Sequence, residues 1–206
     1  MSGRVFTFNG RSNNTTAIDA RTGQVAGTLP LGGKPEFSIA DGKGTIFVNI
    51  EDKSEVVVLD SKKLTVLNRW PLAPGKGPSG LSMDRAKRRL FSTCHNEMMV
   101  VMDADSGKVL DTPAIGKGTD ASAFDPGTGL AYSSNGDGTL TVVEEQPADH
   151  YKVAANVKTE DGARTMTLDT KTHNVYLVTA RFKPAVAGER RRAQEPDSFV
   201  ILVVGK

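Results

Sequence analysis

Apolar residues in this chain fall into short runs separated by Gly, Asp, Asn and Pro, and no segment sustains apolar positions at helical spacing. Short apolar runs bounded by turn residues are typical of β-strands. One stretch of about forty residues shows four such runs in succession. We expect strands at Phe37–Ala40, Thr45–Ile50, Glu55–Leu59 and Leu64–Trp70, with very little α-helix anywhere in the chain.

The same four-strand pattern recurs along the chain, and an aromatic residue marks its second strand. The aromatics follow one another at intervals of 41, 44, 41 and 44 residues, at Phe6, Phe47, Phe91, Tyr132 and Tyr176. The equivalent second strands after the first are expected at Thr45–Ile50, Arg89–Thr93, Leu130–Ser134 and Val175–Thr179. A repeat of about 40 to 45 residues is typical of the blades of a β-propeller.

Acidic residues support the same register. One series ends an apolar run and is followed six residues later by valine: Asp19 and Val25, Asp60 and Val66, Asp103 and Val109. Glu144 takes the place of the acid in the fourth unit. A second series precedes the aromatics, at Asp41, Asp84, Asp125 and Asp169. Because an Asp side chain accepts hydrogen bonds from backbone amides that follow it, both series predict tight turns between strands.

Counting strands from this register gives 3, 4, 4, 4 and 3, about 18 in all, in one all-β propeller domain over residues 1–206. The expected bounds are a partial blade at 3–31, full blades at 35–72, 78–115 and 119–158, and a partial blade at 163–206 with an insertion at 183–197. Seven blades would need roughly 290 residues, so we expect the later part of a longer propeller. Unpaired edges in the terminal blades predict self-association.

The loops beside these strands carry a family resemblance. Gly33–Phe37, Asn49–Glu55, Cys94–Asn96 and Asn135–Leu140, set beside the aromatic strands, resemble bacterial YVTN-repeat propellers of the YncE type, within the lactonase-like seven-bladed propellers. The resemblance implies a disc of blades around a central channel, with ligands bound at one mouth. It also implies a periplasmic or extracellular location, whereas Met1–Arg4 shows no signal segment, so the compartment stays unknown.

In a blade whose strands run up and down, the connection from the fourth strand to the next blade and the loop between the second and third strands lie at one rim. Function is expected at this rim. The connections between blades supply Glu36, Ser79, Asp120 and Arg164, and the loops supply Asn9, Asn49, His95 and Asn135.

Two carboxylates and several amide oxygens at a channel mouth would suit a divalent cation such as Ca²⁺. The candidate metal ligands are Glu36, Asp120, Asn49 and Asn135, and the candidate catalytic residues are His95, Asp120 and Glu36. Such a cation would polarise the carbonyl of a lactone, with His95 as general base. The alternative is structural, because an Asn in such a loop commonly satisfies backbone groups between blades.

Three connections between blades also contain Gly-Lys, which gives Lys34, Lys76 and Lys117 at intervals of 42 and 41 residues. These lysines would form a partial ring of ammonium groups that favours an anionic or carbonyl-bearing ligand. Ser79 and Arg164 are further candidate ligand-binding residues. The alternative is that the lysines are simply solvated.

Composition narrows the remaining classes of function. A net charge of +2 gives no general argument for nucleic acid, and no apolar run is long enough to span a membrane. Gly75–Gly80 matches a dinucleotide fingerprint, but a strand follows it instead of a helix, so no nucleotide cofactor is expected. Cys94 and His95 are neighbours in an extended chain, so their side chains point to opposite faces and cannot form a nucleophile and base pair. Cys94 is therefore expected to pack in the core.

The insertion at 183–197 carries Arg190–Arg192 and is interpreted as a lid, a nucleic-acid contact or an inert loop. Two functional hypotheses remain. The first is a propeller that binds a small ligand, in its most specific form a cation-dependent lactone hydrolase, and the second is a non-catalytic binding or scaffold propeller of the envelope. Sequence alone does not separate them.

Overall fold

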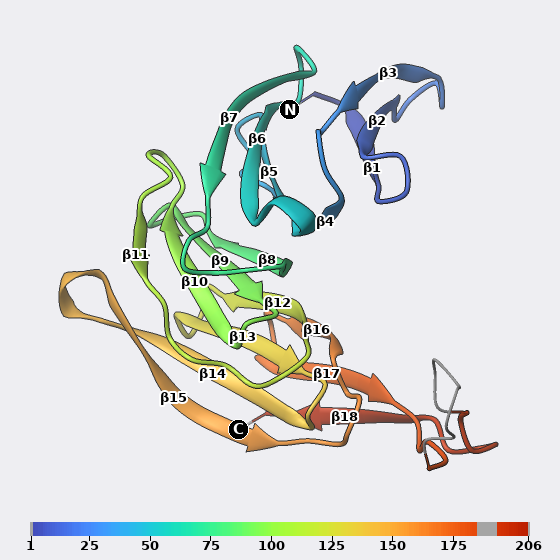
Figure 1. Cartoon of the computed structure of the whole chain (residues 1–206), viewed down its shortest axis with the longest axis vertical. Helices are drawn as coiled ribbons and strands as arrows, with labels where there is room; N and C mark the ends of the chain where they lie inside the picture. The colour runs from blue at the N-terminus through green and yellow to red at the C-terminus, as the bar shows by residue number, and fades with distance from the viewer. Residues whose placement is uncertain (1, 185–192, 206) are drawn as a thin grey trace.

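The structure is a computed structural model, and it describes residues 2–184 and 193–205. Over these residues the chain forms five antiparallel sheets that follow one another in sequence, and we call them blades 1 to 5 (Figure 1). Blades 2, 3 and 4 have four strands, whereas blades 1 and 5 have three. The helical content of the described residues is two short 3-10 turns, at Glu51–Lys53 and Pro147–Asp149.

Each strand pairs with the strand that follows it, so every blade is a simple meander. Blade 1 contains β1 (Arg4–Asn9), β2 (Asn14–Asp19) and β3 (Val25–Pro30). Blade 2 contains β4 (Pro35–Ala40), β5 (Thr45–Ile50), β6 (Glu55–Asp60) and β7 (Thr65–Pro71). Blade 3 contains β8 (Pro78–Asp84), β9 (Arg89–Cys94), β10 (Met98–Asp103) and β11 (Val109–Asp111).

Blade 4 contains β12 (Thr119–Asp125), β13 (Leu130–Asn135), β14 (Thr139–Gln146) and β15 (His150–Lys158). Blade 5 contains β16 (Thr165–Asp169), β17 (Asn174–Thr179) and β18 (Val200–Val204). The predicted all-β fold class, with 3, 4, 4, 4 and 3 strands, is confirmed. Several strands begin or end one or two residues from their predicted bounds. β7 begins at Thr65 and not at Leu64, because Leu64 has a φ of 55° and belongs to the turn before it.

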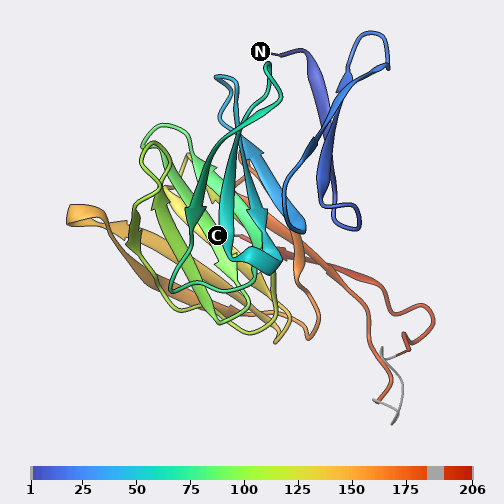
Figure 2. The same cartoon turned by 45° about the horizontal axis from the view of Figure 1, so that its top comes forward.

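The blades are arranged along an arc, with their first strands on its concave side (Figure 1). β4 packs beside β8, β8 beside β12, and β12 beside β16. Blades 1 and 5 lie at the two ends of the arc, and the described parts of the connection between β17 and β18, at 180–184 and 193–199, project from the body (Figure 2). The first strands therefore line the inner side of the arc, where the sequence places the channel.

Packing between blades explains the ladder of aromatic residues. Each of the first four aromatics lies in the apolar cluster that joins its blade to the next one: Phe6, Phe47, Phe91 and Tyr132. The facing blade supplies aliphatic side chains such as Val48, Leu90 and Leu177. Phe47 also stacks on Trp70, with ring centroids 6.0 Å apart. The core is therefore a series of layers between sheets, not one central cluster.

The second series of Asp residues forms the predicted turns and also ties two pairs of neighbouring blades. Asp41 accepts hydrogen bonds from the amides of Lys43 and Thr45, and Arg88 of blade 3 lies 3.2 Å from its Oδ2. Asp125 is bound in the same way by His173 of blade 5, whose Nδ1 lies 2.7 Å from Oδ2. Both carboxylates are fully or almost fully buried, and they hold the turns after β4 and β12 against the neighbouring blades.

The inner strands of blades 3 and 4 approach closely because Gly80 has no side chain. A Cβ at this position would lie 2.4 Å from the amide nitrogen of Ser122 and 2.6 Å from the carbonyl carbon of Ala121. These are backbone atoms, so they cannot move aside as the end of a flexible side chain could. The spacing of β8 and β12 therefore requires glycine here.

We expect Gly80→Ala to destabilise the protein by about 2 kcal/mol, because the added methyl group must push two strands apart. Gly10→Ala is the matched control, since its Cβ would meet nothing closer than 3.6 Å. The control should change the free energy of unfolding by less than about 0.5 kcal/mol. Urea unfolding followed by circular dichroism measures both; equal midpoints for the two variants would contradict this account of the spacing.

Candidate functional site

The rim predicted to carry function is built by a contact that repeats in blades 2, 3 and 4. In each blade, the lysine of the Gly-Lys pair donates its backbone N–H to an Asp or Asn side chain of the loop between the second and third strands. The three pairs are Lys34 with Asp52, Lys76 with Asn96 and Lys117 with Asp137, at 2.7, 2.8 and 2.7 Å. This contact holds the incoming connection against the loop.

The glycine before each lysine is required by the same packing. A Cβ at Gly33, Gly75 or Gly116 would lie 2.4 to 2.5 Å from a side-chain atom of the same blade. The regular Gly-Lys spacing therefore has a structural cause in the glycine and in the lysine's backbone amide. The spacing does not by itself require a role for the three ammonium groups. Lys76 and Lys117 are exposed residues.

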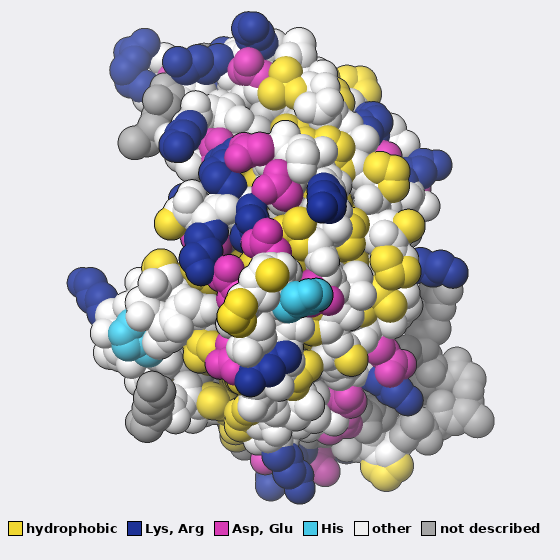
Figure 3. Space-filling view, turned by 90° about the vertical axis from the view of Figure 1, so that its left-hand side faces the viewer, with side chains coloured by type: hydrophobic (Ala, Val, Ile, Leu, Met, Phe, Trp, Pro, Cys, Tyr) yellow, Lys and Arg dark blue, Asp and Glu magenta, His cyan; other side chains and the backbone are white. Residues whose placement is uncertain are grey.

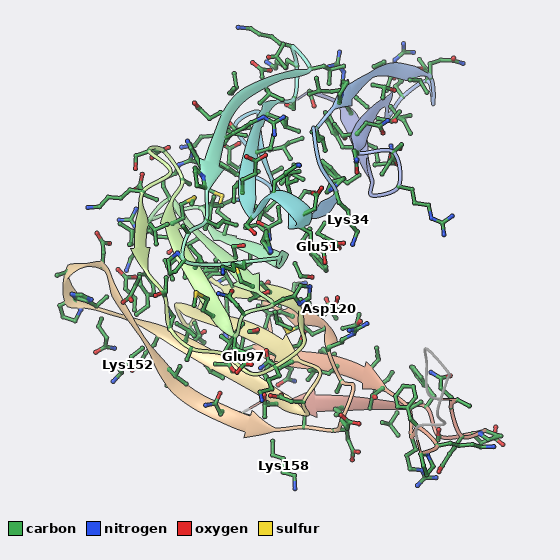
Figure 4. The ribbon with its side chains drawn as sticks, in the orientation of Figure 1. Lys34, Glu51, Glu97, Asp120, Lys152 and Lys158 are labelled. Carbon is green, nitrogen blue, oxygen red and sulfur yellow. The ribbon has the colours of Figure 1, made fainter. Side chains whose placement is uncertain are left out.

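Blade 2 adds a cluster of charged side chains to this contact. The ammonium of Lys34 lies 2.7 Å from Oε1 of Glu36 and also contacts Oε2 of Glu51. Glu36 is the second residue of the inner strand β4, and Glu51 is the first residue of the short turn after β5. Figure 4 shows Lys34 and Glu51 close together on the concave side of the arc, with Asp120 farther along the same side. The cluster thus lies where the channel mouth is expected.

His95 extends the cluster to blade 3. Its Nε2 lies 3.4 Å from Oε1 of Glu51, and its side chain is about half exposed at 45%. The backbone N–H of His95 donates to the carbonyl of Gly77, which fixes the start of the loop after β9. Glu51 therefore stands between an ammonium and an imidazole. With neutral histidine, the group of Lys34, Glu36, Glu51 and His95 has a net charge of −1.

Electrostatics within the cluster favour the charged forms. Burial would raise the pKa of Glu51, but the hydrogen bond and the charge of Lys34 outweigh it, and the pKa lies below its usual range. The pKa of Lys34 is raised by hydrogen bonds to Glu36 and Glu51. The ion pairs therefore persist at neutral pH.

Two further candidates meet on the neighbouring inner strands. The hydroxyl of Ser79 donates to the backbone carbonyl of Asp120 at 3.0 Å, so Ser79 joins β8 to β12. The carboxylate of Asp120 accepts a hydrogen bond of 3.2 Å from Thr165 on β16. β8 lies between the strands that carry Glu36 and Asp120. Asp120 is therefore a second acidic group on the inner side, separated from the Lys34 cluster by one strand.

The candidate asparagines have structural partners. Asn49 is fully buried, donates to the carbonyls of Ser79 and Gly80, and accepts a hydrogen bond from Ser92. Asn135 is also fully buried, accepts from Ser133, and donates to Thr139 and Thr141.

Asn49 and Asn135 are also not equivalent positions. Asn49 is the fifth residue of β5, whereas Asn135 is the sixth residue of β13, so their positions in the repeat differ by one residue. Asn9 binds Asn14 and Thr16 within blade 1. Asn49 satisfies backbone groups of the next blade, as in the structural alternative, whereas Asn9 and Asn135 bond polar side chains of their own blades.

Arg164 lies on an exposed position, and its backbone carbonyl accepts a hydrogen bond from Ser134. Phe182, just before the insertion, forms an isolated β-bridge with Gln194 inside it, and Arg190–Arg192 lie outside the described residues. Cys94 is fully buried between blades 2 and 3, and burial raises the pKa of its thiol to about 11. Its expected packing role is confirmed.

The described residues do not fit the divalent-cation site that the sequence predicts. Within 2–184 and 193–205, no three His, Cys, Asp or Glu side chains lie in a metal-binding arrangement. The oxygens of Asn49 and Asn135 already accept hydrogen bonds, and an ammonium sits between Glu36 and Glu51. The carboxylates of blade 2 are thus organised around the ammonium of Lys34.

Sequence reasoning missed Glu51, which joins the cluster. It belongs to no ladder, because the 3-10 turn that carries it occurs in blade 2 and not at the same point of blades 3 and 4. A signal was present: Glu51 lies directly after the strand that contains Asn49, at the predicted rim.

Comparison with solved structures decides the fold. The chain is similar to Kuenenia stuttgartiensis hydrazine synthase, with a TM-score of 0.78, 17% identity, and coverage of 98% of this chain and 58% of that one. It is also similar to the WD40 β-propeller domain of Doa1, with a TM-score of 0.70, 10% identity, and coverage of 100% and 62%. The chain is a β-propeller. It spans about six tenths of the length of both propeller chains.

At these identities the likeness concerns the fold alone. No protein-family model and no curated protein matches the chain. None of the described helices has the length and apolar character needed to cross a membrane. The side chains at the rim are therefore the features from which a function can be inferred.

We expect Lys34→Met to raise the pKa of Glu51 towards or above its ordinary value, since the cation that stabilises its carboxylate is removed. A lowered carboxyl pKa stabilises the fold above the unfolded value of about 4.3, and this contribution is lost as the pH falls through the folded value. The stability difference between wild type and variant should therefore be present at pH 7 and shrink below about pH 4.

Carbon-detected NMR titration of the Glu51 carboxyl measures the shift, and thermal unfolding at several pH values measures the stability difference. Lys152→Met is the matched control, because Lys152 makes a similar ion pair with Glu144 at 2.9 Å on blade 4 (Figure 4). An unchanged Glu51 titration in Lys34→Met would show that the ion pair does not form in solution.

Proposed function

We propose that this chain is a YVTN-type, lactonase-like propeller that binds a small ligand at the channel mouth through Lys34, Glu36, Glu51 and His95. The observation that carries the proposal is the position of Lys34, which holds two carboxylates beside a half-exposed imidazole. Groups from two blades meet there on the concave side of the arc. Ligand sites of propellers and barrels are commonly placed at such mouths.

The chemistry of the cluster favours an oxygen-rich, largely neutral ligand. Carboxylates accept hydrogen bonds from hydroxyl groups, and an ammonium donates to a carbonyl oxygen. The net charge of −1 does not favour an anion. A hydroxylated lactone combines both kinds of group, so it is the substrate class we propose.

If the lactone is opened, His95 is the general base of this proposal, with Glu51 orienting its ring and Lys34 stabilising the oxyanion that forms at the carbonyl. Water attacks the carbonyl carbon, the ring C–O bond breaks, and the proton taken by His95 passes to the leaving alkoxide. An imidazole is suited to this work near neutral pH. An ammonium close to the carbonyl lowers the energy of the anionic intermediate.

A binding or scaffold propeller without catalysis is the second candidate, and the salt bridges favour it. Glu51, which contacts His95, and the neighbouring Glu36 are both already paired with Lys34. The face shown in Figure 3 carries basic and acidic side chains interspersed, with no large area of one sign. This distribution on the visible face gives no support for nucleic acid as the partner.

The test is hydrolysis of a panel of hydroxylated lactones, followed by pH-stat titration of the acid released. His95→Gln should lower turnover about 100-fold or more, because a general base contributes at least that factor. Lys34→Met should weaken binding and turnover together. Lys152→Met should behave as wild type.

The same assay with chelator, and with added Ca²⁺, tests the cation dependence that the sequence predicts. A loss of activity that Ca²⁺ restores would support a divalent site in place of the Lys34-centred one. Binding without hydrolysis, measured by calorimetry and lost in Lys34→Met, would establish the scaffold function. Absence of both binding and hydrolysis across the panel would refute the proposed ligand class.

A further inference from the structure

The Asp at the end of the first strand has two separate tasks in blades 2 and 4. Its Oδ1 accepts backbone N–H groups of its own turn, as in Asp41 and Asp125. Its Oδ2 binds a side chain of the next blade. Nη1 of Arg88 lies 3.2 Å from Oδ2 of Asp41. Nδ1 of His173 lies 2.7 Å from Oδ2 of Asp125. These contacts tie blade 2 to blade 3 and blade 4 to blade 5.

The two side chains come from equivalent positions. Arg88 and His173 each lie directly before the second strand of their blade. This position has a positive φ in each of blades 2 to 5, with values of 114° at Gly44, 57° at Arg88, 73° at Gly129 and 62° at His173. Residues other than glycine rarely adopt this conformation. The two non-glycine residues are those whose side chains bind the preceding blade.

Between blades 3 and 4 the carboxylate is present but the side chain that would bind it is not. Asp84 is only 8% exposed, and its Oδ1 accepts the N–H groups of Ala86 and Lys87 at 2.8 and 3.1 Å. No group among the described residues donates to its Oδ2, and this atom is not sealed from solvent. The residue at the equivalent of Arg88 is Gly129, and a Cβ there would meet nothing within 4 Å.

A second contact made by blade 3 has no counterpart in blade 4. Arg85 donates to the carbonyl of Ala40 at 3.1 and 2.8 Å, and so binds blade 3 to blade 2. Its counterpart in blade 4 is Pro126, because each follows the Asp of its turn. A proline side chain donates no hydrogen bond. Blade 4 therefore lacks the equivalents of both guanidinium groups that blade 3 places on blade 2.

The charges around Asp84 favour a cation. Lys87, in the same turn, places its ammonium 2.5 Å from Oε2 of Glu145 on blade 4. Within the part of the chain that the structure describes, no basic side chain forms an ion pair with Asp84. Two carboxylates and one ammonium leave this group of three side chains with a net charge of −1.

The place beside Gly129 is reached from solvent. At the other two junctions the equivalent side chains, Arg88 and His173, are 21% and 42% exposed while they bind their buried carboxylates. Blades 3 and 4 each have four strands, and blades 2 and 5 flank them. Complete sheets therefore form both walls of this junction.

We propose that Asp84 and the open space beside Gly129 form a binding site for a guanidinium group carried by another molecule. The group lies where Arg88 lies between blades 2 and 3, and it donates to Oδ2 of Asp84. A guanidinium fits because it keeps its charge, is weakly hydrated and presents a planar fork of N–H groups to a carboxylate. It comes from a free guanidinium compound or from an arginine side chain of a polypeptide. The site lies on the rim opposite to Lys34 and does not involve the ligand site proposed there.

Methylguanidinium is the probe, titrated into the full chain and followed by amide NMR shifts. We expect saturable shifts at Lys87 and Gly129, and weaker binding of methylammonium. Asp84→Asn removes the charge but keeps an oxygen for the turn amides. This variant should weaken binding at least about tenfold. Asp60→Asn is the matched control, because Asp60 accepts amides of its own turn in the same way but belongs to a different turn of blade 2. It should bind as wild type.

Filling the space from the protein side gives an independent test. Gly129→Arg places a guanidinium in the site and should weaken methylguanidinium binding at least about tenfold. Gly129→Ala changes the same backbone position without reaching Asp84, so it should bind as wild type. Thermal unfolding checks that all variants fold, and the two Gly129 variants decide the question if Asp84→Asn does not.

The source of the group is determined with a pentapeptide that has a central arginine and with its citrulline analogue, which has a similar shape without the charge. Tighter binding of the arginine peptide than of methylguanidinium identifies a polypeptide, whereas equal or weaker binding identifies a free compound. Equal binding of the two peptides, undiminished methylguanidinium binding in folded Asp84→Asn or Gly129→Arg, or no saturable binding of methylguanidinium would overturn the proposal.

Discussion

The structure depends on face-to-face packing between successive sheets. A three- or four-stranded sheet of this size does not bury enough apolar surface alone, so each blade is stabilised by the next. An aromatic side chain, Phe6, Phe47, Phe91 or Tyr132, takes part in each of the four apolar clusters between blades. Burying one such ring contributes roughly 1.5–3 kcal/mol. The period of the chain is therefore the period of its core.

The position of the candidate site follows from this packing. Sheets that meet face to face bring their first strands close together, as at Gly80, where there is no room for a Cβ beside Ala121 and Ser122. The connections that enter these strands must then lie against the loops of the same rim. The contact of Lys34 with Asp52 fixes one of them, and it places the Lys34 ammonium within reach of Glu51. The ion pair between Lys34 and Glu51 is thus a consequence of where the backbone of Lys34 is held.

The fold could be predicted because the same sequence pattern recurs in each blade. Five aromatic residues and two series of acidic residues indicate the same register independently. The site could be predicted only in part. Lys34, Glu36 and His95 could be found because the topology assigns their loops to one rim. Asn49 and Asn135 were expected to converge, but a one-residue offset and complete burial give them structural partners.

Glu51 directly follows its strand, as His95 does in blade 3, but the residue type at that place changes from blade to blade, so the repeat did not mark Glu51 as a candidate. The reason for both differences is physical. A repeat determines backbone position to within a residue, but the direction of a side chain reverses with each residue of a strand.

The exposed apolar residues at the two ends of the arc occupy the same repeat positions as residues that are buried in the inner blades. Val203 is 57% exposed, while Val58, at the same position of blade 2, is 3% exposed. At the other end of the arc, Val5 is 54% exposed and Ile46, its counterpart, is 6% exposed. The residue types are alike between the repeats, and only the presence of a neighbouring blade differs. Exposure at the two ends is therefore a property of position in the arc, and each terminal face retains the apolar character of a surface that packs against another sheet.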